Sequence, residues 1–392
     1  MKRWLIVGAM LGLVFVLATS LTPTAMAGPK EIRIGVSAPM SGTAAGWGIP
    51  PYQAAQLHAE KINAAGGVDV GGKKYTIKVF GEDNKYQVAA ATAAMEKMVY
   101  RDKINVLWTF GGAPVLATQK KLERIPMLHF IVGWDPKVRG PQFPYTYSTG
   151  MIPADFGEEL FAYCKKRWNL KTAIIVNERS ESGVYCEREG TKAAKAAGYK
   201  VLPPEWYEVG TTDFYPMVSR IISTKADCIM GTMTPPRDAA MILKQRDELG
   251  GEFVYIHWSA NVDVALRTAP KASENKYPFR YQDFSQTERG RAFEKAYVKK
   301  WKENPEWSAQ EAYDFVGVYT KAVQIAGTLN SVKVKAALDA PGFTYDGVMG
   351  DGYKFGGMSI YKRNSNMYYP IGVAVIKNGK VKVLDIIPVR PK

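Results

Sequence analysis

Histidine and cysteine, the side chains that most often carry acid–base, nucleophilic or zinc chemistry, are scarce in this sequence. His58, His129 and His257 are far apart along the chain, and no His-x-x-x-His or Cys-x-x-Cys pair has the spacing of metal ligands. His129 and His257 end predicted strands, where ligands of open α/β sheets bind, but we interpret both as hydrogen-bonded structural residues. The sequence therefore predicts no metal site and no cofactor.

Other catalytic motifs are incomplete. Residues 67–73 nearly have the spacing of a phosphate-binding loop, but Lys74 replaces the hydroxyl residue that would hold magnesium. The segment also leads from a helix into a strand, which is the reverse of the required order. A Gly-x-Ser-x-Gly turn, which presents the nucleophile of many hydrolases, is absent from the sequence. We therefore expect a binding protein and not an enzyme.

The composition excludes several other classes of protein. The 392 residues are 46% hydrophobic and 23% charged, values that do not fit a disordered tail, a fibrous repeat or a multi-span membrane protein. The length suggests two domains of similar size. The formal net charge is +15, but the basic residues are scattered along the chain, so we expect no nucleic-acid partner.

The first residues have the pattern of an export signal. Residues 1–3 are positively charged, residues 4–21 form an uncharged and mostly apolar run, and residues 25–27 read Ala-Met-Ala, which is a small-x-small cleavage site. An uncleaved membrane anchor is the alternative, but Pro23 and the Ala-x-Ala site favour cleavage. We expect residues 1–27 to be a cleaved signal peptide and the mature protein to be periplasmic.

Three cysteines, Cys164, Cys186 and Cys228, lie in the mature chain. An oxidising compartment could pair two of them. A bridge between Cys164 and Cys186 is possible but not indicated, and Cys228 lies in an apolar stretch where a buried thiol is expected.

The elements that must position any site alternate between strand and helix. Hydrophobic periodicity predicts two successive series of this kind, with a boundary in the proline-rich stretch 136–148. Strands and helices that alternate in short units form parallel sheets covered on both faces, so we predict an α/β fold with two doubly wound parallel-sheet lobes. The first series is strand 31–36, helix 51–64, strand 74–80, helix 86–100, strand 104–110, helix 116–124 and strand 127–132. The second is helix 155–168, strand 172–177, helix 183–197, strand 200–202, helix 214–223, strand 227–232, helix 236–249 and strand 253–257.

The last hundred residues contain too few strands for a third lobe. Residues 288–303, 308–327 and 332–338 are predicted helices that must pack on an existing lobe. Residues 371–387 read as a hairpin, because Asn378-Gly379 between alternating apolar residues favours a type I′ turn.

Two segments resemble a known family. Residues 36–48, Val-Ser-Ala-Pro-Met-Ser-Gly-Thr-Ala-Ala-Gly-Trp-Gly, and residues 62–68, Ile-Asn-Ala-Ala-Gly-Gly-Val, are similar to the leucine-isoleucine-valine-binding proteins, which are type I periplasmic binding proteins of ABC importers. The resemblance implies three hinge crossings, which we place near Gly150, Tyr281 and Tyr345. The first lobe would then comprise residues 28–149 and 282–344, and the second residues 150–281 and 345–392.

The resemblance also implies where a ligand binds. Trp47 matches the family tryptophan that lines the ligand's side-chain pocket. Where amino-acid-binding members have hydroxyl-rich loops after the third and fourth strands, this chain has residues 111–114 and 133–135. The loss of these hydroxyls favours an aromatic or apolar carboxylate, held by glycine N–H groups and stacked on tryptophan. The candidate ligand-binding residues are Trp47, Gly111, Gly112, Ala113, Gly133, Trp134, Asp135, Ser182, Thr234, Trp258 and Ser259, of which Trp134 and Trp258 could instead pack beneath a loop.

The function implied by the resemblance is capture of a small molecule in a cleft between the lobes, followed by hinge closure and delivery to an ABC permease in the inner membrane. We expect a monomer. A ligand-sensing module of the same fold, which signals to a membrane receptor or kinase, is the alternative, and an exported enzyme has the least support.

Overall fold

The computed structural model describes residues 30–42, 44–122, 124–258, 260–274 and 276–391. The predicted signal peptide 1–27 and the candidate residue Ser259 lie outside these residues. None of the helices formed by the described residues is both long enough and apolar enough to span a membrane.

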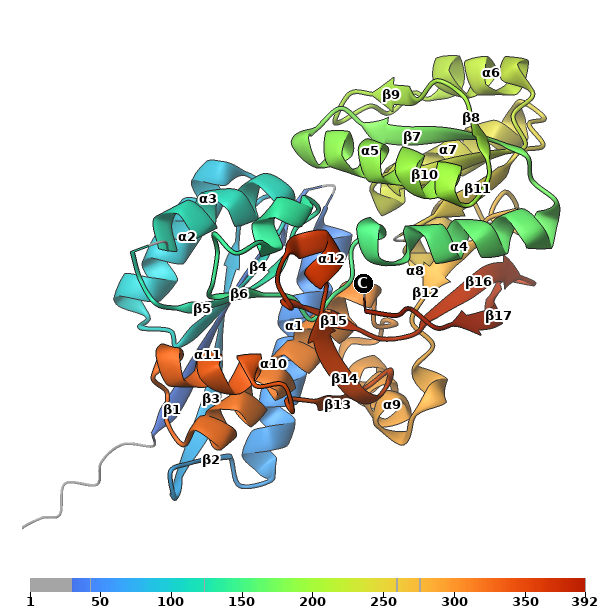
Figure 1. Ribbon diagram of the computed structural model, residues 1–392. Coiled ribbons are helices and arrows are strands. Elements are labelled where there is room, and N and C mark those ends of the chain that lie inside the picture. The colour runs from blue at the N-terminus through green and yellow to red at the C-terminus, as the bar shows by residue number, and fades with distance from the viewer. Residues whose placement is uncertain (1–29, 43, 123, 259, 275, 392) are drawn as a thin grey trace, which may run out of the picture.

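The first lobe is built around a six-stranded sheet with the order β2-β3-β1-β4-β5-β6 (Figure 1). All neighbouring strands are parallel except β2 and β3. Every residue of β4 and β5 is buried, which is typical of strands with helices on both faces. The strands are β1 (Glu31–Ala38), β2 (Val68–Val70), β3 (Lys73–Asp83), β4 (Val106–Phe110), β5 (Leu128–Val132) and β6 (Thr146–Tyr147), and the helices among them are α1 (Ala45–Ala64), α2 (Val88–Glu96) and α3 (Gly112–Leu122).

The second lobe is built around an eight-stranded sheet with the order β17-β16-β12-β11-β10-β7-β8, and β9 pairs with β7. The strands from β12 to β8 are parallel, whereas β16 and β17 are antiparallel to their neighbours. The strands are β7 (Thr172–Glu178), β8 (Lys200–Val201), β9 (Glu205–Tyr207), β10 (Cys228–Met233), β11 (Val254–His257), β12 (Phe279–Tyr281), β16 (Ile371–Lys377) and β17 (Lys380–Ile387), and the helices are α4 (Pro153–Trp168), α5 (Glu181–Ala196), α6 (Tyr215–Thr224), α7 (Pro236–Glu248) and α8 (Val262–Thr268).

The two doubly wound lobes confirm the predicted fold class. The predicted hairpin is also confirmed, with Asn378 at φ 53° and Gly379 at φ 67° in the turn between β16 and β17. Three helix boundaries were wrong. The predicted helix 51–64 begins at Ala45, and the predicted helix 116–124 is Gly112–Leu122. The predicted helix 86–100 begins at Val88 and ends in a π-helical turn, Lys97–Arg101, so Tyr86 lies in the preceding loop.

The three late helices are α9 (Glu288–Trp301), α10 (Trp307–Ala326) and α11 (Ser331–Asp339), and α10 packs along α1 of the first lobe (Figure 1). A three-stranded sheet that the sequence did not predict follows them. Its strands are β13 (Tyr345–Gly347), β14 (Gly350–Gly356) and β15 (Asn366–Tyr368), with the short helix α12 (Met358–Tyr361) before β15. The residue boundaries of the two lobes remain a prediction.

A buried polar cluster joins segments that are far apart in the sequence where the chain passes between the lobes. Arg139 donates from Nε to the Asn366 side-chain oxygen at 3.0 Å, and Asn366 lies at the start of β15. Asp155, in the first turn of α4, accepts hydrogen bonds from the hydroxyls of Tyr361 at 2.7 Å and Tyr368 at 2.6 Å. These bonds attach the start of the second lobe to the three-stranded sheet.

A second buried pair lies at the next crossing. Arg280 on β12 donates to the backbone oxygen of Met151 at 3.2 Å, and its Nη2 lies 3.8 Å from a carboxylate oxygen of Glu311 on α10. Burial raises the pKa of Glu311 to about 7, although Arg280 and Arg139 oppose this shift. The Thr149 hydroxyl donates to the backbone oxygen of Glu311, so β12, α10 and the first crossing are held together.

Gly48 allows α1 to approach the loop that follows β1. A Cβ atom at this position would lie 2.0 Å from the backbone oxygen of Pro39, so Gly48→Ala must displace backbone. We expect Gly48→Ala to lower the free energy of unfolding by about 1–3 kcal/mol, measured by urea denaturation. Gly342→Ala is the matched control, because a Cβ there meets nothing within 4 Å. Equal stability of the two variants would contradict this account.

Candidate ligand-binding cleft

A cavity of about 400 Å³ opens between the lobes, at the carboxyl ends of parallel strands. We call it the Trp47 cavity. The first lobe contributes the loops after β1 and β3 and the first turns of α1 and α3, and the second lobe contributes the end of β7, the first turn of α5 and the loops after β7, β9 and β10. The lining residues are Ser41, Gly42, Ala44, Trp47, Lys85, Tyr86, Gln87, Ala113, Pro114, Glu178, Ser180, Glu181, Ser182, Val209 and Pro235.

Tyr86 is aimed at this cavity by an unusual backbone conformation. Lys85 and Tyr86 both have positive φ, 52° and 58°, which non-glycine residues adopt only when their surroundings hold them. The Asp83 carboxylate accepts the N–H of Lys85 at 2.8 Å, and the Asn84 side chain accepts the N–H of Tyr86 at 2.9 Å. The Asn84 amide also donates to the backbone oxygen of Phe110 at 2.9 Å, which anchors the turn on β4.

Tyr86 also connects the lobes. Its hydroxyl donates to the Ser182 hydroxyl of the second lobe at 3.3 Å and accepts from the Trp134 ring N–H at 3.3 Å. The structure therefore has the two lobes in direct contact beside the cavity.

Aromatic rings form a continuous wall behind the cavity. Phe110 lies at its centre, with ring centroids 6.2 Å from Trp47, 6.0 Å from Trp134 and 5.9 Å from Trp307. Trp134 and Trp307 are also 5.9 Å apart. Such tilted and edge-on contacts stabilise a packed aromatic cluster, and all four side chains are buried, so the cluster is a rigid apolar layer behind the cavity.

Two helix N-termini meet at the cavity. Gly111, at φ 115°, turns the chain from β4 into α3, and a Cβ at Gly112 would lie 2.3 Å from the Ser182 hydroxyl oxygen. Opposite, Ser180 caps α5 by accepting the N–H of Gly183 at 3.0 Å. The first N–H groups of a helix have no acceptor within the helix, and the helix dipole makes this end positive. Both ends can therefore bind a carboxylate.

Glu178 places a carboxyl group in the same cavity. Burial raises its pKa to about 7, the nearby Asp238 carboxylate adds to the shift, and the Ser180 hydroxyl, which donates at 2.8 Å, opposes it. Glu178 therefore changes charge near neutral pH.

The structure brings some of the candidate residues together at this cavity. Trp47, Ala113 and Ser182 line it, and Gly111, Gly112 and Trp134 border those residues. Tyr86, Glu178 and Ser180 also line it, and the sequence analysis did not select them as candidate residues. Tyr86 follows β3, Glu178 is the last residue of β7 and Ser180 follows β7, and these strand-end positions are the signal that could have identified them.

Other candidate residues lie elsewhere. Asp135 lines a separate interlobe groove, where it accepts the N–H of Lys137 at 2.9 Å. Trp258 packs against Phe156 and Phe161 of α4 inside the second lobe. The Thr234 hydroxyl donates to the backbone oxygen of Val176.

Gly133 is another candidate that faces inward: a Cβ there would meet Val138 and Val115, and its backbone oxygen accepts from Arg139 at 2.5 Å.

His129 and His257 are both buried. Burial lowers the pKa of His129 to about 3 and that of His257 to about 4, so both rings are neutral at physiological pH. The three cysteines are free and buried. Within the described part of the chain, no group of three or more His, Cys, Asp or Glu side chains could hold a metal ion.

The chain is similar to known proteins. A family model described as periplasmic binding protein matches residues 31–377. The leucine-, isoleucine-, valine-, threonine- and alanine-binding protein of Pseudomonas aeruginosa is 23% identical over 315 residues, which cover 80% of this chain and 83% of the relative.

Solved structures share the fold. A leucine-binding protein from Thermotoga maritima superposes with a TM-score of 0.77 at 18% identity, over 91% of this chain and 99% of that one. A solute-binding protein from R. palustris in complex with benzoate has a TM-score of 0.79 at 17% identity, over 92% and 98% of the two chains. The family match, which spans most of the chain, confirms the resemblance seen in the sequence: the protein belongs to the periplasmic binding protein family, with Leu/Ile/Val-binding proteins among its relatives.

Proposed function

We propose that this protein is the periplasmic receptor of an ABC importer of the branched-chain amino acid type, and that it captures an aromatic or apolar carboxylate in the Trp47 cavity. The observation that carries this proposal is the cavity itself, in which two helix N-termini oppose one another beside Trp47 and Tyr86. The N-termini supply N–H donors for a carboxylate, and the rings supply a flat apolar surface for the rest of the ligand.

Proteins of similar fold bind small carboxylic acids, including an amino acid. Structures of similar fold contain benzoate, 3,4-dihydroxybenzoic acid or isoleucine. An amino acid would need an acceptor for its ammonium group, and Glu178 and Glu181 are the carboxylates among the residues that line the cavity. Glu178 is partly protonated at neutral pH, so the neutral form can donate a hydrogen bond to a ligand carboxylate. We therefore favour a simple carboxylate over an amino acid.

Hinge closure would complete capture. The cavity is lined from both lobes, so a ligand there contacts both only when they approach, and binding shifts the open–closed equilibrium toward the closed state. The closed receptor would present the tips of both lobes to a permease in the inner membrane. Export through a cleaved signal peptide and action as a monomer complete the proposal.

A thermal-shift screen tests the ligand class. The compounds are benzoate, its neutral amide benzamide, leucine and valine. Benzoate at a hundredfold excess over Kd should stabilise the protein by about 2.7 kcal/mol, and small-angle scattering should show compaction. Tight binding of leucine or valine without binding of benzoate would overturn the ligand class. An unchanged radius of gyration with bound ligand would overturn closure.

Trp47 should contribute to affinity through its ring. Trp47→Leu keeps an apolar side chain but removes the flat surface, so we expect benzoate binding to weaken by about 1–3 kcal/mol by calorimetry. Trp206→Leu is the matched control, because Trp206 is half-buried on β9 and does not line the cavity. If both variants bind benzoate as the wild type does, the ring is not part of the site.

Benzoate affinity should fall as pH rises through the pKa of Glu178, about 7. The neutral Glu178 carboxyl can lie beside the benzoate anion, whereas the ionised carboxylate repels it. The loss of benzoate affinity should therefore approach about tenfold per pH unit above this pKa. Glu178→Gln should bind with little pH dependence between pH 6 and 8. Glu181→Gln, an exposed neighbour in the same cavity, should keep the wild-type profile. A benzoate affinity that rises with pH, or that stays constant, would contradict this role of Glu178.

A further inference from the structure

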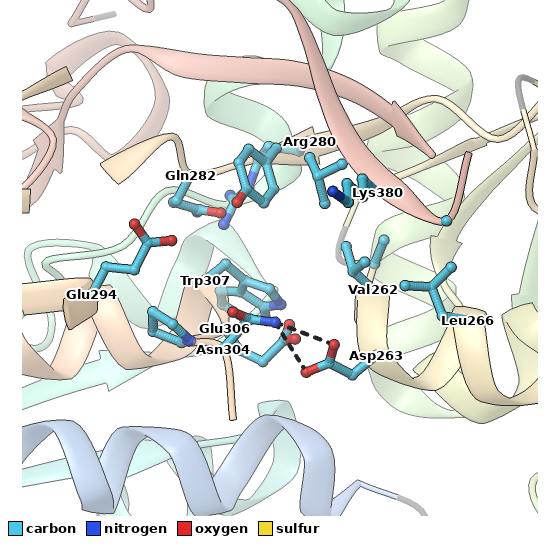
Figure 2. Close-up of a pocket in the computed structure, with 15 residues that line it drawn as sticks. Val262, Asp263, Leu266, Arg280, Gln282, Glu294, Asn304, Glu306, Trp307 and Lys380 are labelled. Atoms are coloured by element: carbon cyan, nitrogen blue, oxygen red, sulfur yellow. Dashed lines mark hydrogen bonds between the residues drawn. The ribbon is translucent and has the colours of Figure 1, made fainter. Parts of the chain in front are cut away.

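A second cavity, of about 300 Å³, lies between the lobes on the hinge side (Figure 2). We call it the Arg280 cavity. The second lobe contributes α8, β12 and the β16–β17 turn, and the other wall is α9, the loop that leads into α10 and the first residue of α10. Figure 2 shows Gln282 and Trp307 on one side of this space, with Val262 and Leu266 on the other.

Buried hydrogen-bond donors without a partner gather around this cavity. Arg280, Gln282 and Trp307 line it and are 4%, 4% and 5% exposed. The Nε and Nη2 atoms of Arg280, the side-chain nitrogen of Gln282 and the ring nitrogen of Trp307 have no hydrogen-bond partner among the described residues. Folded proteins satisfy nearly all of their buried polar atoms, so four such donors around one cavity indicate a missing acceptor.

The position of Arg280 leaves one edge of its guanidinium open. Its Nη1 donates to the Met151 backbone oxygen at 3.2 Å. Its central carbon lies 4.7 Å from the ring centroid of Phe156 and 5.2 Å from that of Trp307, so aromatic rings hold the guanidinium in place. The N–H groups of Nε and Nη2 lie side by side along the remaining edge and match the two oxygens of a carboxylate. This edge is therefore oriented for a bidentate bond before any ligand arrives.

Glu311 does not occupy the open edge. Its nearest oxygen lies 3.8 Å from Nη2 of Arg280, which is beyond hydrogen-bond distance. Burial also raises the pKa of Glu311 to about 7, so a large share of this carboxyl group is neutral at physiological pH. The positive charge of Arg280 is therefore only partly balanced by the protein.

The acidic residues of the cavity do not exclude an anion. Burial raises the pKa of Glu306 well above its ordinary value, and nearby carboxylates add to the shift, so Glu306 is protonated at neutral pH and can itself donate. Burial also raises the pKa of Glu294. The Asp263 carboxylate accepts from the Asn304 amide nitrogen at 3.3 Å (Figure 2). Lys380 adds a positive charge at the exposed rim.

The remaining walls suit a short apolar chain. Val262 and Leu266 of α8 supply aliphatic surface, and Tyr281 and Pro305 add rings. An apolar group that is buried against these side chains is removed from water, which favours binding. The cavity therefore combines donors for a polar group on one side with apolar surface on the other.

We propose that the Arg280 cavity binds the carboxylate of a small apolar acid, with the open guanidinium edge of Arg280, the Gln282 amide and the Trp307 ring N–H as its donors. This site is separate from the Trp47 cavity and does not depend on the ligand proposed there. A carboxylate offers two acceptor oxygens to this set of donors, whereas an amide offers one and an ammonium group offers none.

The test is isothermal titration calorimetry of the chain without its predicted signal peptide, with butyrate, butyramide and butylammonium as ligands. Butyrate should bind saturably and at least about tenfold more tightly than butyramide, and butylammonium should not bind. Arg280→Lys keeps the charge but removes the planar edge, so it should weaken butyrate binding by at least about tenfold. Arg246→Lys is the matched control, because Arg246 is a buried arginine of the same lobe that does not line the cavity, and it should stay within about twofold of the wild type.

Two further variants guard against misfolding and separate the cavities. If Arg280→Lys lowers the melting temperature, Gln282→Leu, which removes one donor at similar size, should by itself weaken butyrate binding at least about threefold. Trp47→Leu should leave butyrate binding unchanged, whether or not benzoate binds in the Trp47 cavity. The proposal is overturned if butyrate does not saturate the wild type, if butyramide or butylammonium binds as tightly, if only Trp47→Leu loses butyrate binding, or if Arg280→Lys and Gln282→Leu both bind butyrate like the control.

Discussion

The buried charges at the lobe crossings are the constraint on which the rest of this structure depends. Arg139 and Asp155 meet Asn366 from opposite sides, and Arg280 approaches Glu311 on α10. Removing one partner of such a group leaves a buried charge uncompensated, so the arrangement is costly to break even where it adds little net stability. It therefore specifies one path for the chain between the sheets.

The fold was largely predictable because its strands are short, fully buried apolar runs between helices of regular length. Val106–Phe110 and Leu128–Val132 could only be interior parallel strands, and Asn378-Gly379 specified the terminal hairpin. The three-stranded sheet could not be predicted from the sequence, because β13 and β15 have only three residues each and β14 is rich in glycine. Strands of this kind have no periodicity of their own, and tertiary contacts determine where they form.

The site was predictable only to the level of loops. Loops that follow parallel strands converge on one edge, and Trp47, Ala113 and Ser182 do line the same cavity, although their contact with a ligand remains a prediction. Which way a side chain in such a loop points is decided by packing, and no local pattern encodes it. Trp258 points into the second lobe because it packs against Phe156 and Phe161. Tyr86 points into the cleft because the Asp83 and Asn84 side chains stabilise two consecutive residues in the left-handed conformation.

The aromatic wall gives the two cavities a physical connection. Phe110 touches both Trp47, which lines one cavity, and Trp307, which lines the other. Each cavity also takes residues from both lobes, so an occupant of either one has its full set of contacts only when the lobes are together.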